Sequence, residues 1–347
     1  VATFYPDLMD ERFESAFAIY HQRYSTNTFP QWRLAQPFRM LAHNGEINTL
    51  KGNTNWMKSH EIRMASDAFG KADADVKPII QPGGSDSAAL DNVFEVLVRA
   101  GRSAPMAKTL LVPEAWAKST TMKESHRALY SYSNAVMEPW DGPAALAMFD
   151  GRWAVAGLDR NGLRPMRYAL TEDGLLVVGS ETGMCPLDDR KVNERGRIGA
   201  GKMIAVDTHE GRIYGHEEII DELAAAHPYE QWLGNIIDLD ATLKGAEPRL
   251  FESRGDLLRR QYAAGLTLED VELILQPMLE EGKEAIGSMG DDAPRAVLSD
   301  KNRPLSHYFR QNFSQVTNPP IDPLREDRVM SLATRFKNLG NILAQDE

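Results

Sequence analysis

The stretch that decides the fold reads AALAMFDGRWAVAGLDRNGLRPMRYALTEDGLLVVGS, residues 144–180. Short apolar runs within it are separated by Asp150–Gly151, Asn161–Gly162 and Asp173–Gly174. Such pairs tolerate the positive φ of tight turns, so three of them at close spacing predict about four antiparallel strands.

The sequence on both sides of this stretch extends the pattern. Downstream, residues 202–214 predict another hairpin. Upstream, residues 17–48 predict strand, loop and strand, with Asn44–Gly45 as a hairpin turn. Between residues 48 and 144, residues 90–98 place apolar side chains at i, i+3, i+4, i+7 and i+8, which predicts one helix. Its N-cap is expected within residues 85–87, and Gly101 is expected at C′. The predicted class is therefore α+β.

The length of 347 residues suggests about two domains. We expect the first to span residues 1–235. A linker and the beginning of a second domain follow in residues 236–347, where Thr267 and Asp270 form a capping-box-like pair and Pro277 kinks or restarts a helix. Neither end of the chain has a recognisable tail or signal peptide, and we expect the chain to be a piece of a longer protein.

Composition excludes several classes of function. Apolar residues at 42% and charged residues at 26% indicate a folded globular protein rather than a disordered one. Lys and Arg number 39 against 50 Asp and Glu, a net charge of −11 that disfavours nucleic acid as a partner. No apolar run is long enough to cross a bilayer. The single cysteine, Cys185, excludes an internal disulfide and suggests a reducing compartment, the cytoplasm.

Two apparent motifs have ordinary explanations. Residues 196–202 fit G-x-x-x-x-G-K, but Met203 stands where a P-loop needs Ser or Thr, and the following residues predict a strand instead of a helix. The eight histidines form no H-E-x-x-H pattern, so no metal site is predicted. Cys185 is interpreted as a structural thiol.

Three short motifs are more informative: HQRYST (21–26), AHNGEIN (42–48) and SDSAAL (85–90). Each has an ordinary explanation when taken alone. Arg23 suits a surface ion pair, Asn44–Gly45 suits a turn, and Asp86 suits a helix N-cap.

Taken in this order, the motifs resemble those of the class II glutamine amidotransferases, whose fold is the N-terminal nucleophile hydrolase αββα sandwich. The amino-acid sequences of the motifs are similar to those of the glutamate synthase large (alpha) subunit family in particular. The resemblance continues through GLDRNGLRPMRY (157–168). SDKNRPL (299–305), NPPIDP (318–323) and RFKNLGN (335–341) resemble the central domain of that family.

The resemblance implies a role for each of four residues. Arg23 would bind the α-carboxylate of glutamine, and Asp86 would accept its α-ammonium group. Asn44, through its side-chain amide, and Gly45, through its backbone N–H, would form the oxyanion hole. The family's nucleophile is an N-terminal Cys, which this chain lacks, so we expect an incomplete sandwich and no glutaminase activity from the chain alone.

For the parent protein, the resemblance implies that ammonia from glutamine is transferred to 2-oxoglutarate and the product reduced to glutamate. FMN and a 3Fe-4S cluster would be bound outside this fragment, since one cysteine cannot hold a cluster. A small NADPH-oxidising subunit or ferredoxin would supply electrons. Two alternatives stay open: another class II amidotransferase, such as an amidophosphoribosyltransferase or asparagine synthetase, and a non-catalytic glutamine-binding module.

Overall fold

The computed structural model describes residues 3–23, 29–181, 183–245, 255–282, 285, 298–301, 305 and 340–345. The chain forms two compact units. One comprises residues 1–237 together with 337–347, and the other comprises residues 238–336. The motif at 318–323 lies outside the described residues.

The first unit contains eight strands and six α-helices among its described residues. The strands are β1 (Leu41–Gly45), β2 (Ala144–Phe149), β3 (Trp153–Leu158), β4 (Arg167–Thr171), β5 (Leu176–Gly179), β6 (Val192–Arg197), β7 (Met203–Asp207) and β8 (Arg212–Tyr214). The helices are α1 (Leu50–His60), α2 (Asp86–Arg99), α3 (Ala104–Leu111), α4 (Glu124–Val136), α5 (His216–Ala225) and α6 (Tyr229–Leu233).

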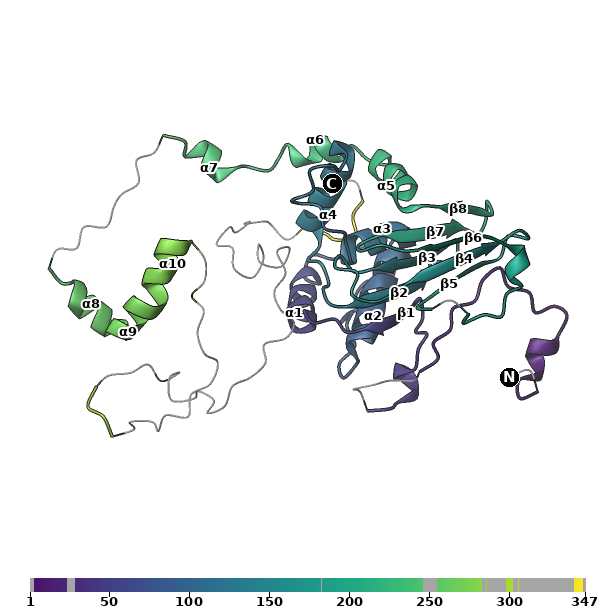
Figure 1. The fold of residues 1–347 in the computed structure, drawn as a ribbon, viewed down its shortest axis with the longest axis horizontal. Coiled ribbons are helices and arrows are strands. Elements are labelled where there is room, and N and C mark those ends of the chain that lie inside the picture. The colour runs from purple at the N-terminus through teal and green to yellow at the C-terminus, as the bar shows by residue number, and fades with distance from the viewer. Residues whose placement is uncertain are drawn as a thin grey trace. The chain divides into compact units, whose positions relative to one another are not determined.

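The strands form two antiparallel sheets. The larger has the order β1-β2-β3-β7-β8, and the smaller has the order β5-β4-β6. Helices α2, α3 and α5 contact β1, β3 and β7 on one face of the larger sheet (Figure 1). The described part of this unit is thus layered as helices, five-stranded sheet and three-stranded sheet, and the predicted α+β class is confirmed.

The alternation of side chains along the central strands explains why the larger sheet is covered on both faces. On β2, Leu146 and Met148 belong to the core cluster shared with the helices. Their neighbour Ala145 belongs to a second cluster, which includes Leu158 of β3 and packs against Val178 of β5. Successive side chains of a strand point to opposite faces, so β2 contributes to both cores.

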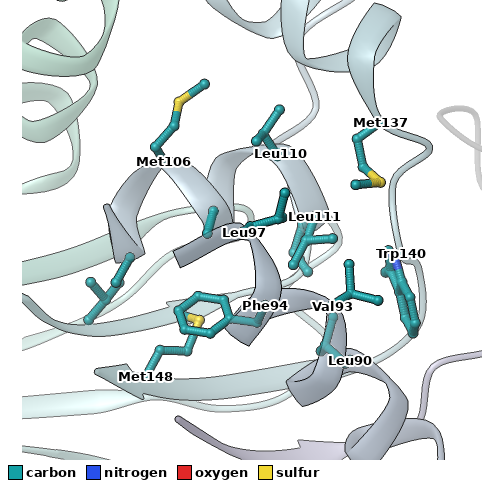
Figure 2. Close-up of a cluster of buried hydrophobic side chains, with 14 of the residues drawn as sticks. Leu90, Val93, Phe94, Leu97, Met106, Leu110, Leu111, Met137, Trp140 and Met148 are labelled. Carbon is teal, nitrogen blue, oxygen red and sulfur yellow. The ribbon is translucent and has the colours of Figure 1, made fainter. Parts of the chain in front are cut away.

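Helix α2 forms where the apolar period predicted it. Its stripe of Leu90, Val93, Phe94 and Leu97 is buried, and Figure 2 shows Phe94 against Met148 of the sheet. Beyond Arg99 the helix ends in a Schellman motif, in which the N–H groups that follow the helix return to its last carbonyls. Gly101, the predicted C′ residue, has φ of 107°, as this motif requires.

The four strands predicted for residues 144–180 are confirmed as β2 to β5, and the hairpin at 202–214 is confirmed as β7 and β8. The strand predicted near Phe17 is wrong. Its ring instead packs on Phe149 with the centroids 3.6 Å apart, without strand pairing. One strand, β6, was missed.

The second unit contains α7 (Leu239–Thr242), α8 (Leu257–Ala263), α9 (Leu268–Asp270) and α10 (Gln276–Glu281). The predicted capping box is confirmed, because the Thr267 side chain accepts from the Asp270 N–H and the Asp270 carboxylate accepts from the Thr267 N–H. A π turn over Val271–Leu275 precedes α10, whose first turn contains Pro277. Residues 268–281 are helical without a break, so the expectation that Pro277 restarts a helix is wrong; Pro277, which has no N–H to donate, follows directly on the π turn.

A short segment near the C-terminus, residues 340–345, belongs to the first unit. Ile342 and Leu343 are 2–3% exposed and join the main core. The buried Arg102 guanidinium, just beyond α2, donates to the carbonyls of Ile342 and Ala344 at 3.0 and 2.5 Å. Asn341 adds two hydrogen bonds to the backbone of Ala65. The segment is thus held by both apolar burial and charge-assisted hydrogen bonds.

Candidate active site

Two of the predicted site residues, Asn44 and Gly45, are the exposed last residues of β1. They pair with Ala145 and Ala144 of β2, so the predicted hairpin turn at Asn44–Gly45 is wrong. Gly45 does have a positive φ, 152°. A Cβ at this position would lie 1.7 Å from the carbonyl oxygen of Pro143. Glycine is therefore required here by the close approach of two backbones.

Helix α2 holds both ends of β1 through two carboxylates. Asp91 accepts hydrogen bonds from the N–H groups of Met40 and Leu41 at 2.9 and 3.1 Å. Burial raises the pKa of Asp91 despite these bonds. At the other end, Asp86 accepts from the N–H of Ile47 at 2.8 Å. The structure therefore places Asp86 of α2 in contact with the segment that follows Asn44 and Gly45.

Asp86 can accept the hydrogen bond from Ile47 because a different residue, Ser85, caps the helix. Ser85 is the N-cap, and its hydroxyl accepts from the N–H of Ala88 at 3.1 Å. The alternative in which Asp86 is merely an N-cap is wrong. Asp86 stands in the first turn of α2 with its side chain 22% exposed, where the helix dipole favours a carboxylate.

His43, which sequence reasoning did not select, lies beneath this pair of elements. Its ring is buried, with Nδ1 2.7 Å from the Ser87 hydroxyl and 4.0 Å from Asp86 Oδ2. Burial lowers the pKa of His43, and the charges of Arg164 and His21 lower it further, although Asp86 opposes the shift. The lowered pKa favours the neutral imidazole, which adds no positive charge beside the Asp86 carboxylate.

Arg164 also reaches the site and was not selected as a site residue. It lies in the loop between β3 and β4, and its Nη2 donates to Oδ1 of Asn44. Both residues belong to motifs that carried the family resemblance, at 42–48 and 157–168. Their juxtaposition depends on tertiary structure, so no local pattern predicted it.

Arg23, the fourth predicted residue, lies in an exposed segment without regular secondary structure. Its carbonyl oxygen is 2.5 Å from Nδ1 of His21, whose charge is felt at His43. Among the described residues, no hydrogen bond or ion pair joins the Arg23 side chain to Asn44 or Asp86. The structure thus brings Asn44, Gly45 and Asp86 close together, and the roles of all four residues stay predictions.

Cys185 lies apart from the contacts just described, in the loop after β5. It is half-buried and lines a cavity of about 360 Å³ together with Tyr168 of β4 and Met184. The pattern at 196–202 is not a P-loop. It begins within β6 and leads into β7, and no helix follows to present its N–H groups to a phosphate.

Comparison with known proteins assigns the family. Residues 1–232 match the class II glutamine amidotransferases, and residues 259–347 match the glutamate synthase central domain. The chain therefore belongs to the class II glutamine amidotransferases, which have the N-terminal nucleophile hydrolase fold predicted above.

Its relatives are more specific still. All of this chain aligns at 65% identity with the large chain of NADPH glutamate synthase from Azospirillum brasilense, and at 47% with that from Bacillus subtilis. It is 46% identical, over 98% of its length, to ferredoxin-dependent glutamate synthase 2 of Arabidopsis thaliana. The chain spans 21–23% of the length of these three relatives.

Within the described ranges, no helix is both long and apolar enough to span a membrane. Nor do those residues contain a cluster of three or more His, Cys, Asp or Glu side chains suited to a metal ion.

Proposed function

We propose that this chain supplies most of the glutamine site of a glutamate synthase. The observation that carries the proposal is the attachment of β1 to α2 at both ends, through Asp91 and Asp86. This arrangement holds the Asp86 carboxylate beside the end of β1. That end carries the amide of Asn44 and Gly45, where no residue with a Cβ fits.

Each group then has a distinct task in amide hydrolysis. Asp86 binds the α-ammonium group of glutamine, and Arg23 binds the α-carboxylate. The attacking thiolate comes from a cysteine outside this chain and forms a tetrahedral intermediate at the amide carbon. The Asn44 amide and the Gly45 N–H donate to the oxygen of that intermediate. As it collapses, the C–N bond breaks, and the nitrogen takes the thiol proton from the α-amino group of the same cysteine and leaves as ammonia. Water then hydrolyses the thioester to glutamate and frees the thiol.

The remaining chemistry of the parent protein joins this ammonia to 2-oxoglutarate. FMN and a 3Fe-4S cluster would be held by other parts of the parent protein, and the redox chemistry of glutamate formation would be supplied there rather than by the residues of this chain. An NADPH-oxidising subunit or ferredoxin is the proposed electron donor, as the names of the relatives suggest. The free thiol of Cys185 supports a cytoplasmic location.

The substitution Asp86→Asn tests the proposed ammonium site in the full-length enzyme. Asn keeps an oxygen for the N–H of Ile47 but removes the charge, so the KM for glutamine should rise about tenfold or more. The melting temperature should change little, because Ser85 caps the helix. Steady-state glutaminase kinetics and thermal unfolding provide the two measurements.

A matched control lies on the same helix. Glu95 of α2 forms an ion pair with Arg39, with 2.8 Å between Glu95 Oε2 and Arg39 Nε. The substitution Glu95→Gln should leave the KM for glutamine unchanged. An Asp86→Asn enzyme with the wild-type KM would show that Asp86 serves only to attach α2 to the segment after β1.

Arg23→Ala addresses the proposed carboxylate site. Loss of a charge-assisted contact should lower kcat/KM for glutamine by about ten- to a hundredfold. Glutamate synthesis from added ammonia should persist, because free ammonia does not use this pocket. Equal loss of both activities would assign Arg23 a structural role instead.

A further inference from the structure

An oxyanion hole built from an amide side chain needs that amide held in one orientation. Asn44 is the exposed end of an edge strand, and its side chain has an acceptor oxygen and a donor nitrogen on opposite arms. The nitrogen must face the developing negative charge, and a donor displaced by about 1 Å loses much of its effect. Some other group must therefore fix the oxygen.

Arg164 meets this requirement. Its Nη2 donates to Oδ1 of Asn44 across 120 residues of sequence. A guanidinium has N–H donors but no acceptor, so it can form a hydrogen bond only with the oxygen arm of the amide. The Nδ2 arm of Asn44 is then directed away from Arg164.

The loop that carries Arg164 is itself held firmly. One carboxylate oxygen of Asp159 accepts from the N–H of Ala144 at 2.9 Å, and the other accepts from the N–H of Asn161 at 3.0 Å. The carbonyl of Asp159 accepts from the N–H of Gly201 at 2.7 Å. These bonds connect the loop to the segments that begin β2 and precede β7.

The partly buried position of Arg164 and the reach of its charge support this role. Its Nε is buried and, within the described part of the chain, has no hydrogen-bond partner, whereas the contact between Nη2 and Asn44 is exposed. The guanidinium charge is also felt at the buried His43, where it lowers the pKa. The guanidinium is therefore close enough to the end of β1 to act on charge there.

We propose that Arg164 is the positioning residue of the oxyanion hole, holding Asn44 Oδ1 so that Nδ2 faces the amide oxygen of glutamine. This inference rests on the proposed function, since it presupposes that Asn44 stabilises the oxyanion. The contact that the structure gives Arg164 is with Asn44, not with a reacting group. Its effect on the reaction passes through Asn44.

The test uses the full-length enzyme with four variants: Arg164→Ala, Arg164→Lys, Asn44→Ala and the double variant. Arg164→Ala should lower kcat for glutamine-dependent ammonia release by about ten- to a hundredfold, with KM changed less than about threefold. Arg164→Lys should recover part of the loss, because an ammonium also donates to Oδ1. Glutamate synthesis from added ammonia should stay at the wild-type level in all four.

The double variant isolates the coupling between the two residues. If Arg164 acts through Asn44, removing it from the Asn44→Ala enzyme should cause almost no further loss. Arg167→Ala is the matched control, an exposed arginine three residues away in β4, and should leave both activities unchanged.

Three results would overturn the inference: additive losses in the double variant, an Arg164→Ala enzyme with the wild-type kcat, or equal loss of ammonia-dependent synthesis. In each of these cases, a low kcat of the Asn44→Ala enzyme would still support the proposed glutamine site. A fully active Asn44→Ala enzyme would instead overturn the oxyanion assignment itself and, with it, the role of Arg164.

Discussion

Asn44→Ala should lower kcat for glutamine hydrolysis by about 10²- to 10³-fold in the full-length enzyme. This is the effect of removing one oxyanion-hole donor, because the lost hydrogen bond forms mainly in the transition state. KM should change little, since ground-state binding depends on charges elsewhere on glutamine. Glutamate synthesis from added ammonia should be unaffected. Parallel assays with glutamine and with ammonium chloride give the comparison.

Asn55→Ala serves as the control, because Asn55 is an exposed asparagine on α1. It should leave both activities at the wild-type level. If Asn44→Ala slowed glutamine-dependent and ammonia-dependent synthesis alike, Asn44 would have to be assigned to the fold rather than to catalysis.

Gly45→Ala should combine loss of glutaminase activity with a large loss of stability. The added Cβ would lie 1.7 Å from the Pro143 oxygen at a φ of 152°, so β1 must shift away from the segment before β2. Overpacking and backbone strain together should cost about 3–5 kcal/mol. The melting temperature of this domain should fall on the order of 10 °C. Thermal unfolding and glutaminase assays on the same preparation test both parts.

Gly52 offers a matched substitution in the opposite direction. It lies within α1, and a Cβ there would meet no heavy atom within 4 Å. Gly52→Ala should therefore stabilise the domain by about 0.5–1 kcal/mol through helix propensity. A Gly45→Ala enzyme as stable and active as the Gly52→Ala enzyme would contradict the close backbone approach described here.

The parts of the fold that sequence predicted are those in which a local pattern and the tertiary structure agree. The stripe from Leu90 to Leu97 has the period of a helix, and the turns at residues 150–174 need little beyond their own Asx–Gly pairs. Strand β6 was missed for a physical reason. Its residues, VNERGR, are largely exposed at the edge of the small sheet, so burial imposes no apolar alternation on them.

The candidate site shows the complementary limit. Asn44–Gly45 carries the local signal of a turn, yet it pairs with β2 because α2 holds both ends of β1. The resemblance selected Asn44, Gly45 and Asp86, which the structure brings together. It did not select His43 or Arg164, because their partners Ser87 and Asn44 are 44 and 120 residues distant in sequence. Such pairings follow from the packing of the whole unit.

The segment at residues 340–345 has a consequence for how this protein can be divided. By sequence it belongs to the stretch that matches the glutamate synthase central domain, 259–347. By its contacts it is part of the unit that carries the glutamine site, where Arg102 binds its carbonyls. A chimera that exchanges the central domain at the boundary of the sequence match would therefore remove a piece of the amidotransferase core. Grafts between relatives should keep residues 337–347 with their own Arg102.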